Sequence, residues 1–192
     1  MLNYYVIDTE TTGLTPGHHE VVEISIIRCS DRHQLTKFIK AEHPDRSSPY
    51  ALKITKKSMA DLKVGESKED VVSACNNFFN QDNKTPEHRC IVAHNAKFDK
   101  NFCHALWQSV NQEFPAVCWL DTMSLAKKWA KKNGINRPKL SLASVINFTG
   151  VMPVPGEHTA KADARNTYLV WKKNMDENID YLTSIKRYPH IF

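Results

Sequence analysis

The order of hydrophobic patterns along the chain is the sequence feature that most constrains its fold. Three β-branched and aromatic runs come first, at residues 4–7, 21–28 and 34–40, with polar turn-forming residues between them. They predict a buried first strand followed by an antiparallel meander. From Ser67 onward, apolar residues recur at spacings of three and four, which predicts an amphipathic helix.

The second half of the chain alternates between extended and helical patterns. A short apolar strand is predicted at residues 90–93, and Phe98, Phe102 and Leu106 then recur four residues apart in a second helix. Further helices are predicted at residues 121–132, 141–148 and 159–174. Strands first, then alternating helices and strands, predict an α/β fold with a sheet of mixed direction covered by helices.

Composition indicates one folded domain. A chain of 192 residues can form one sizeable core, whereas two independent cores would each be rather small. Hydrophobic residues make up 41% of the chain and charged residues 24%, which is typical of a globular protein rather than a disordered or fibrous one. We therefore expect a single domain over residues 1–192.

Charge and cysteine usage argue against several classes of protein. The formal net charge of +5 permits a polyanionic partner without requiring one. The five cysteines form no Cys-x-x-Cys pair, which argues against a disulfide framework and a thiolate zinc site. No stretch approaches the ~20 apolar residues that span a bilayer, and the first residues lack the features of a signal peptide. We expect no membrane association and a cytoplasmic location.

Two acids, Asp8 and Glu10, follow the first apolar run at a spacing of two. Side chains alternate across a strand, so both carboxylates should project from one face. Adjacent carboxylates at a buried strand end repel one another unless a cation or hydrogen-bond donors neutralise them, and hard divalent ions prefer oxygen ligands. The pair therefore predicts a divalent metal site. The alternative is an exposed acidic strand end before a turn at Gly13.

Two more acids lie on predicted helices close to apolar stripes. Asp163 falls among the small and apolar side chains of the last helix, and Asp99 lies in the first turn of its helix beside Phe98. An acid that faces a core needs a partner, and a metal shared with Asp8 would supply one. The alternative for Asp163 is an acid favoured by the helix dipole.

Three residues near the predicted helix starts are weighed in the same way. Two-metal cleavage of a phosphodiester needs a base with a near-neutral pKa, and His158, in the loop five residues before Asp163, meets that demand. Its alternative is an incidental loop histidine. Asn95 is predicted to cap the second helix. His94 fits either a hydrogen-bonded core histidine or a substrate contact.

Three segments together carry a family resemblance. They are DTETTGL at residues 8–14, VAHNAKFD at residues 92–99, and the pair His158 and Asp163. In order and spacing they resemble the three exonuclease motifs of the DEDDh superfamily, which includes the proofreading epsilon subunit of bacterial DNA polymerase III and exonuclease X. The resemblance runs from Tyr4 to about Trp171. It implies a ribonuclease H-like fold with a mixed five-stranded sheet and helices on both faces.

The resemblance also implies a role for each motif residue. The acids Asp8, Glu10, Asp99 and Asp163 match the ligands of two Mg²⁺ or Mn²⁺ ions, and His158 matches the general base. Residues expected to contact the terminal nucleotide are Thr11, Thr12, Gly13, Leu14, His94 and Phe98. Stacking of bases on apolar or aromatic side chains would explain tolerance of sequence.

Two departures from the family pattern concern the subtype. Residues 54–58 read ITKKS where many relatives carry a histidine-centred IHxIT segment, so the substrate contact of that histidine is in doubt here. The chain ends at Phe192 without a polymerase-binding tail, which favours a stand-alone nuclease over a replicative subunit.

A basic run begins within the helix predicted at residues 121–132. It comprises Lys127, Lys128, Lys131 and Lys132, with Arg137 and Lys139 beyond. Such a run could grip the backbone of single-stranded nucleic acid. Its alternative is a solvated helix face, because Leu125 and Trp129 supply the buried stripe of the same helix.

These features predict a metal-dependent 3′-to-5′ exonuclease that releases nucleoside 5′-monophosphates from single-stranded or 3′-frayed DNA. DNA repair, replication and proofreading are the settings such an activity serves. An exoribonuclease is the alternative, because discrimination rests on contacts near the sugar 2′ position that no motif reveals. A non-catalytic nucleic-acid-binding module is the third interpretation. Association with a DNA polymerase and the oligomeric state stay open.

Overall fold

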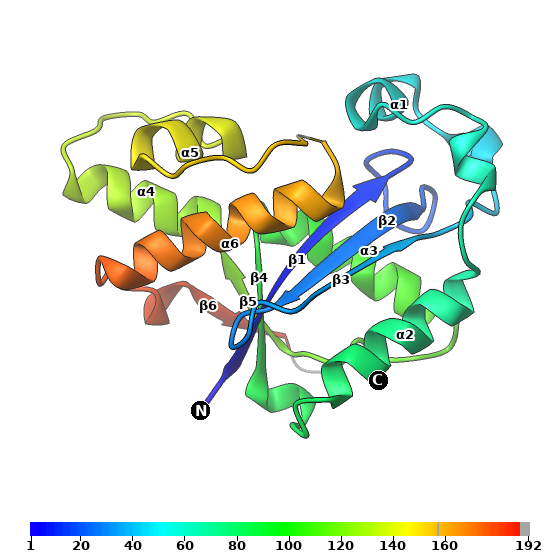
Figure 1. Cartoon of the computed structure of the whole chain (residues 1–192), viewed down its shortest axis with the longest axis horizontal. Coiled ribbons are helices and arrows are strands. Elements are labelled where there is room, and N and C mark those ends of the chain that lie inside the picture. The colour runs from blue at the N-terminus through cyan, green and yellow to red at the C-terminus, as the bar shows by residue number, and fades with distance from the viewer. Residues whose placement is uncertain (157, 189–192) are drawn as a thin grey trace.

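The computed structural model describes residues 1–156 and 158–188, and a six-stranded sheet lies at its centre (Figure 1). Strands β1, β4 and β5 run parallel to one another, β2 is antiparallel to β1 and β3, and β6 is antiparallel to β5. The predicted α/β class with a mixed sheet is confirmed, but the sheet has six strands and not five. In spatial order the strands are β3 (Gln34–Phe38), β2 (Val21–Arg28), β1 (Asn3–Thr11), β4 (Arg89–Ala93), β5 (Cys118–Asp121) and β6 (Ile185–Arg187).

The residue patterns predicted neither β5, whose last residue was assigned to the following helix, nor β6, which is the strand beyond the expected five. Strand β6 has three residues, and two of them, Lys186 and Arg187, are exposed. Backbone pairing with the edge of β5 holds it, with Ile185 opposite Leu120. Pairing of this kind depends on where the chain returns to the sheet, and not on hydrophobic alternation.

Strand β1 continues beyond its apolar run. The polar residues after Ile7 remain paired with β2 through Thr11, with a shift of register between Glu10 and Thr11. Asp8 and Glu10 therefore lie within the strand, and not in a turn after it. Because they are two residues apart, they share the face of the sheet that Val6 also faces.

Helices cover both faces of the sheet (Figure 1). Tyr5 and Ile7 of β1 pack with α2 (Lys68–Asn80) and α3 (Ala96–Gln108) through Phe79 and Phe102. On the opposite face, Val6 packs with α4 (Thr122–Lys132) and α6 (Ala160–Asp176). This division follows from the alternation of side chains along one strand, since both faces of β1 are apolar before Asp8.

The remaining helices are short. Helix α5 (Leu142–Thr149) packs on α4 and α6 rather than on the sheet. Helix α1 (Pro49–Thr55) lies near the arrowhead of β1 in Figure 1. Single 3-10 turns are formed by Pro44–Arg46, Asp61–Lys63, Pro86–His88 and Leu182–Ser184. No helix in the described part of the chain is long and apolar enough to cross a lipid bilayer.

Side-chain caps fix the starts of most predicted helices. The side chains of Ser67, Asp121, Ser141 and Thr159 each accept a hydrogen bond from a backbone N–H in the first turn that follows. Such caps satisfy donors that have no partner within the helix. Asn95 occupies the cap position of α3 in a left-handed conformation (φ 66°), but its side chain makes no capping hydrogen bond. The predicted N-cap position of Asn95 is therefore confirmed, although its side chain does not supply the capping hydrogen bond.

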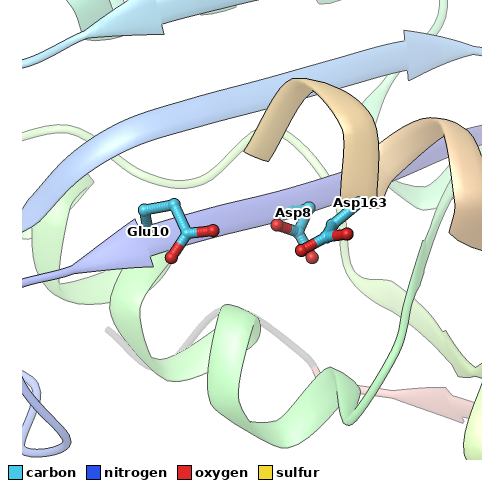
Figure 2. A group of neighbouring side chains, drawn as sticks. All are labelled: Asp8, Glu10 and Asp163. Carbon is cyan, nitrogen blue, oxygen red and sulfur yellow. The ribbon is translucent and has the colours of Figure 1, made fainter. Parts of the chain in front are cut away.

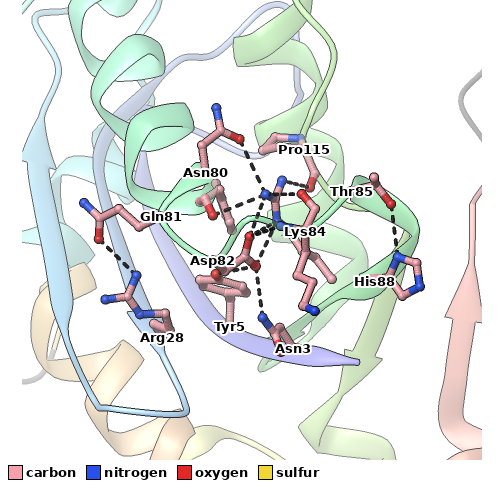
Figure 3. A network of polar contacts seen from close by, with 12 residues as sticks. Asn3, Tyr5, Arg28, Asn80, Gln81, Asp82, Lys84, Thr85, His88 and Pro115 are labelled. Carbon is pink, nitrogen blue, oxygen red and sulfur yellow. Dashed lines mark hydrogen bonds and ion pairs between the residues drawn. The ribbon is translucent and has the colours of Figure 1, made fainter. Parts of the chain in front are cut away.

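A buried ion pair ties the amino end of β4 to the loop after α2 (Figure 3). The side chains of Arg89 and Asp82 are only 2% and 3% exposed, and their closest nitrogen and oxygen are 2.8 Å apart. The Tyr5 hydroxyl donates to the same carboxylate, and Arg89 also donates to three backbone carbonyls, those of Phe79, Lys84 and Pro115. This dense pairing offsets the cost of burying both charges.

Candidate metal centre and adjoining pockets

Three carboxylates converge where β1 meets the first turn of α6. One oxygen from each of Asp8, Glu10 and Asp163 lies within 4.8 Å of the others. Figure 2 shows Asp8 and Glu10 on β1, with Asp163 reaching down from α6 beside Asp8. Helix α6 brings Asp163 here because its cap at Thr159 starts the helix over this face of β1. Asp163 and Asp8 therefore lie together, and their sharing of a metal stays a prediction.

The fourth acid, Asp99, approaches the same point from the opposite layer of helices. It lies in the first turn of α3 and is 3% exposed. Its Oδ1 accepts hydrogen bonds from the backbone N–H of Thr9 at 3.0 Å and from the Thr9 hydroxyl at 2.9 Å. Thr9 faces away from Asp8 and Glu10 along β1, so it can hold Asp99 at the strand edge. We call these four acids the carboxylate centre.

The pKa values of Asp8, Glu10 and Asp99 are all raised above the usual carboxyl range. Burial is the main cause, and it raises the pKa of Glu10 to about 8, with added repulsion from Asp163 and Glu23. Burial also raises the pKa of Asp99 to about 7, although the hydrogen bonds from Thr9 oppose it. The pKa of Asp8 is raised well above its usual range by burial and by Asp99, Glu10 and Asp163. The protein alone therefore disfavours the fully ionised centre.

The sequence analysis did not identify two residues that adjoin the carboxylate centre, Glu23 and Lys57. Glu23 lies opposite Glu10 on β2, and its side chain is 2% exposed. One Glu23 oxygen accepts from the Lys57 ammonium at 2.9 Å, and the other accepts from the backbone N–H of Lys161 at 3.4 Å. Glu23 thus joins the segment after α1 to the first turn of α6. A lone acid inside the apolar run VVEISII was the signal that could have revealed it.

His158 lies beside the centre but contributes its backbone rather than its ring. Its N–H donates to Asp163 Oδ2 at 3.1 Å, and its φ of 63° is in the left-handed region. The residue is exposed and lines a pocket of about 720 Å³ that Lys57, Phe38 and Thr159 also line. The predicted proximity of His158 to Asp163 is confirmed, and its role as a base stays a prediction.

Leu14 and Phe98 meet at a second pocket, of about 230 Å³. Leu14 is 71% exposed, which is unusual for a large apolar side chain. Pro16, Asn95, Lys97 and Asn101 complete the lining. The sequence analysis assigned both Leu14 and Phe98 to the terminal nucleotide, and the structure brings them together. We call this the Leu14–Phe98 pocket.

Residues 11–13 of the first motif make hydrogen bonds that fix the conformation of the loop after β1. The Thr11 hydroxyl donates to the Gly13 carbonyl at 2.6 Å, and the Thr12 hydroxyl accepts from the Glu20 N–H at 2.9 Å. The His19 ring lies against Gly13 so closely that a Cβ there would collide with it. These contacts fix the loop from which Leu14 projects. A substrate contact by Thr11, Thr12 or Gly13 remains a prediction.

His94 uses both ring nitrogens within the protein. Nε2 donates to the Leu140 carbonyl and Nδ1 lies beside the Thr122 hydroxyl, both at 2.8 Å. Burial lowers the pKa of His94, which favours the neutral ring, and Nδ1 and the Thr122 hydroxyl share one hydrogen bond. This is the arrangement of a hydrogen-bonded core histidine, one of the two alternatives that the sequence left open. A nucleotide contact by its ring carbons stays a prediction.

The donor set fits a hard divalent cation. All four groups are carboxylates, and oxygen ligands are those that Mg²⁺ and Mn²⁺ prefer. A bound divalent cation would neutralise their mutual repulsion. Lys57 approaches Glu10 but is already bound to Glu23. Binding of a divalent metal ion is the function that the four buried carboxylates fit.

The match to a family of known sequences covers the segments that carry these motifs. The model of the family described as Exonuclease (RNase_T) matches residues 5–171. The chain is 32% identical over 173 residues to the PolC-type DNA polymerase III of Thermotoga petrophila, covering 88% of this chain and 11% of that protein. It is 26% identical over 163 residues to the DNA polymerase III subunit epsilon of Treponema pallidum, covering 84% and 71%. The chain therefore spans about a tenth of the PolC-type relatives' length.

Solved structures share the fold. Exonuclease X in complex with 5′ overhanging duplex DNA superposes with a TM-score of 0.65 at 25% identity, over 91% of this chain and 92% of that one. The nuclease domain of 3′hExo, a DEDDh family member bound to rAMP, gives 0.74 at 12% identity, over 98% and 97%. The E. coli ExoI–ssDNA complex gives 0.77 at 18% identity, over 95% and 42%. The predicted fold and the resemblance to DEDDh exonucleases are confirmed.

Proposed function

Because this chain belongs to the RNase_T exonuclease family, we propose that it removes nucleotides from the 3′ end of single-stranded or 3′-frayed DNA. The products are nucleoside 5′-monophosphates. The observation that carries this proposal is the convergence of Asp8, Glu10 and Asp163, with Asp99 beside them, near the Leu14–Phe98 pocket. The family match spans most of the chain, which supports one exonuclease domain over residues 1–192.

The carboxylate centre would hold two Mg²⁺ or Mn²⁺ ions through Asp8, Glu10, Asp99 and Asp163. When bound, such ions activate water and neutralise charge on the phosphodiester. The chain's own contribution is to fix the acids from three elements: β1, α3 and α6. Thr9 holds Asp99, and the His158 N–H holds Asp163. Positioning of this kind spares the centre from rearranging when the substrate binds.

His158 is the proposed general base. Its backbone N–H is anchored to Asp163, which keeps the residue beside the acids, and the residue lines a pocket. A histidine ring with a near-neutral pKa can accept the proton of the attacking water. The left-handed backbone at His158 is a strained conformation for a residue with a Cβ, and such strain is concentrated at functional sites.

The Leu14–Phe98 pocket would receive the terminal nucleotide. Exposed Leu14 can wedge against the last base while the Phe98 ring stacks on it, and neither contact reads a base edge. Thr11, Thr12 and Gly13 hold the loop and present backbone groups to the nucleotide, and His94 supports the strand end beneath. Removal of nucleotides without sequence preference follows.

Replication and proofreading are the proposed setting. The relatives named above are a DNA polymerase and a DNA polymerase subunit, which supports DNA over RNA and keeps association with a polymerase as an alternative to the stand-alone nuclease expected from the sequence. The likeness to 3′hExo, bound to rAMP, is the observation that keeps an exoribonuclease as the second candidate. Discrimination would rest on contacts to the 2′-hydroxyl.

Digestion of matched strands tests the substrate. Single-stranded DNA, duplex DNA and RNA of one sequence, labelled at the 5′ end, are incubated with Mg²⁺ or Mn²⁺. We expect single-stranded DNA to be shortened fastest, and Asp8→Ala to abolish shortening. Strands left uncut with either ion, or a fully active Asp8→Ala variant, would refute the proposal. Faster shortening of RNA would select the second candidate.

A further inference from the structure

A strongly basic pocket lies away from the carboxylate centre, between α4 and β6. Its volume is about 650 Å³. Helix α4 lines one side, the loop after it closes one end, and the segment that leads into β6 forms the other wall. The lining residues that carry positive charge are Lys127, Lys128, Lys131, Arg137 and Lys186. We call it the α4–β6 pocket.

Four of these five cations have no acidic partner within the described residues. Lys128 donates to the Asp180 carbonyl and the Thr183 hydroxyl, each at 2.7 Å, and lies 3.7 Å from the Asp180 carboxylate. The ion pairs found among residues 1–156 and 158–188 include none of the other four. Like charges that converge on one hollow repel one another, and a bound anion relieves that repulsion.

The remaining lining suits an ester of phosphate rather than a bare ion. Ser124, Asn136, Thr183 and Ser184 add hydroxyl and amide groups, and Ile135 and Pro138 add apolar surface. Lys127 and Lys131 lie one helical turn apart on α4, so their ammonium groups flank the same stretch of the pocket. A chain of phosphates linked by sugars presents the same alternation of charge and apolar surface.

The α4–β6 pocket is connected to the Leu14–Phe98 pocket by a short path through the fold. Ser124 lines the former and lies in the first turn of α4, three residues after Asp121. The Asp121 carboxylate accepts from the Asn95 N–H at 3.1 Å, and Asn95 lines the latter. One hydrogen bond and one helical turn therefore separate the two sites. A strand whose end occupies the Leu14–Phe98 pocket can extend toward α4.

We propose that the α4–β6 pocket binds the phosphodiester backbone of the substrate strand, several nucleotides away from its 3′ end. This inference rests on the proposed function for the identity of the strand. The structure favours a grip on the backbone over a merely solvated helix face. It does so because Thr183 and Ser184 of the 3-10 turn before β6, and Lys186 of β6, which the sequence did not predict, line the same pocket as the α4 lysines.

A charge-neutralised variant tests the pocket. The variant is Lys127→Gln/Lys131→Gln/Lys186→Gln, and its matched control is Lys84→Gln/Lys172→Gln/Lys173→Gln, which also removes three charges from exposed or ion-paired lysines elsewhere. Fluorescence anisotropy measures binding of a single DNA strand of about 20 nucleotides at several salt concentrations, with Ca²⁺ replacing Mg²⁺ to slow cleavage. Hydrolysis of the p-nitrophenyl ester of thymidine 5′-monophosphate reports on the carboxylate centre alone.

We expect the pocket variant to bind the long strand on the order of tenfold more weakly, and the slope of log affinity against log salt to fall by about 2. Binding of a dinucleotide and hydrolysis of the ester should not change, and the control variant should match the wild type. A second variant, Lys131→Glu, which changes the charge at one position by two units, should also weaken long-strand binding at an unchanged melting temperature.

Equal long-strand affinity and salt slope in the wild type and the pocket variant would overturn the inference, as would an equal loss in the control variant. Failure of the proposed function is separate: the wild type would then hydrolyse neither the ester nor the strand. Binding that depends on the three lysines would still support the pocket in that case.

Discussion

At the scale of single residues, the protonation of the carboxylate centre is the property that can be measured most directly. Burial, followed by neighbouring carboxylates, raises the pKa of Glu10 to about 8, and burial raises that of Asp99 to about 7. Between the usual carboxyl range and these values, the folded metal-free protein binds more protons than the unfolded chain. The contribution of Glu10 and Asp99 to the free energy of unfolding is therefore fully present below the usual carboxyl pKa. It is lost as pH rises through about 7 to about 8, the folded-state pKa values of these two acids.

Melting temperatures measured with and without metal test the sign of this pH dependence. In a chelator, we expect the melting temperature to fall as pH rises from about 5 to about 9, and to fall less in Glu10→Gln. Divalent ions compete with protons for the acids, so the gain in melting temperature from Mg²⁺ should grow with pH. A metal-free melting temperature that rises over this range, equally in both proteins, would contradict the protonated centre.

His158 offers a second test at this scale. Asn tolerates the left-handed backbone that His158 adopts, so His158→Asn removes the base without adding strain. We expect its catalytic rate to fall by roughly 10²–10⁴-fold with metal affinity unchanged. His88→Asn, an exposed histidine at the far end of β4, is the control and should retain full activity. A parallel loss of metal affinity in His158→Asn would assign the residue to the metal site instead.

The same scale shows what could be read from residues alone. Asp8, Glu10 and Asp163 were predictable because acids at strand or helix spacings beside apolar residues demand a partner. Glu23 and Lys57 were not, because their importance comes from pairing between β2 and the segment after α1. His94 was ambiguous until its two hydrogen-bond partners, far along the chain, were placed.

At the scale of elements, the link between β1 and α3 sets the position of Asp99. Thr9 is the residue that makes it, through two hydrogen bonds to one carboxylate oxygen. Thr9→Val keeps the shape of the side chain but removes the hydroxyl. We expect the catalytic rate to fall by about 10–100-fold, the scale of supporting residues at metal sites.

Thr9→Ser supplies the matched comparison, because it restores the hydroxyl. Its rate should return to within a few-fold of the wild type, and both variants should melt within a few degrees of each other. A Thr9→Val rate equal to that of the wild type would show that Asp99 needs no support from the Thr9 hydroxyl.

Helix starts and ends were more predictable than strand number. The helices that begin after Ser67, Ser141 and Thr159 have capping side chains that the sequence displays. Strand β6 lacks any such local signal, because backbone pairing with β5 alone defines it. Its contribution of Lys186 to the α4–β6 pocket was therefore out of reach of sequence patterns.

At the scale of the whole molecule, the buried pair of Arg89 and Asp82 stabilises the end of the sheet opposite the centre (Figure 3). Arg89→Met would leave the Asp82 charge buried without its main partner, so we expect a loss of about 3–5 kcal/mol in the free energy of unfolding. Chemical denaturation measures it. Lys172→Met, which breaks an exposed pair, should have a far smaller effect on the free energy of unfolding.

The pH dependence of this pair has the opposite sign to that of the centre. Burial alone would raise the pKa of Asp82, but hydrogen bonds from Arg89 and Tyr5 outweigh it and hold the pKa below its usual range. The pair therefore contributes stability above the usual carboxyl pKa and loses it as pH falls further. Equal acid sensitivity of the wild type and Arg89→Met would contradict this contribution.

The most direct measurement of the proposed chemistry follows one DNA strand, labelled at its 5′ end, with Mg²⁺ or Mn²⁺ present. We predict a ladder of products shortened one nucleotide at a time from the 3′ end, release of nucleoside 5′-monophosphates, and no shortening by Asp163→Asn. Early loss of the 5′ label, internal cuts without a ladder, or full activity in Asp163→Asn would contradict a 3′-to-5′ exonuclease built on the four carboxylates.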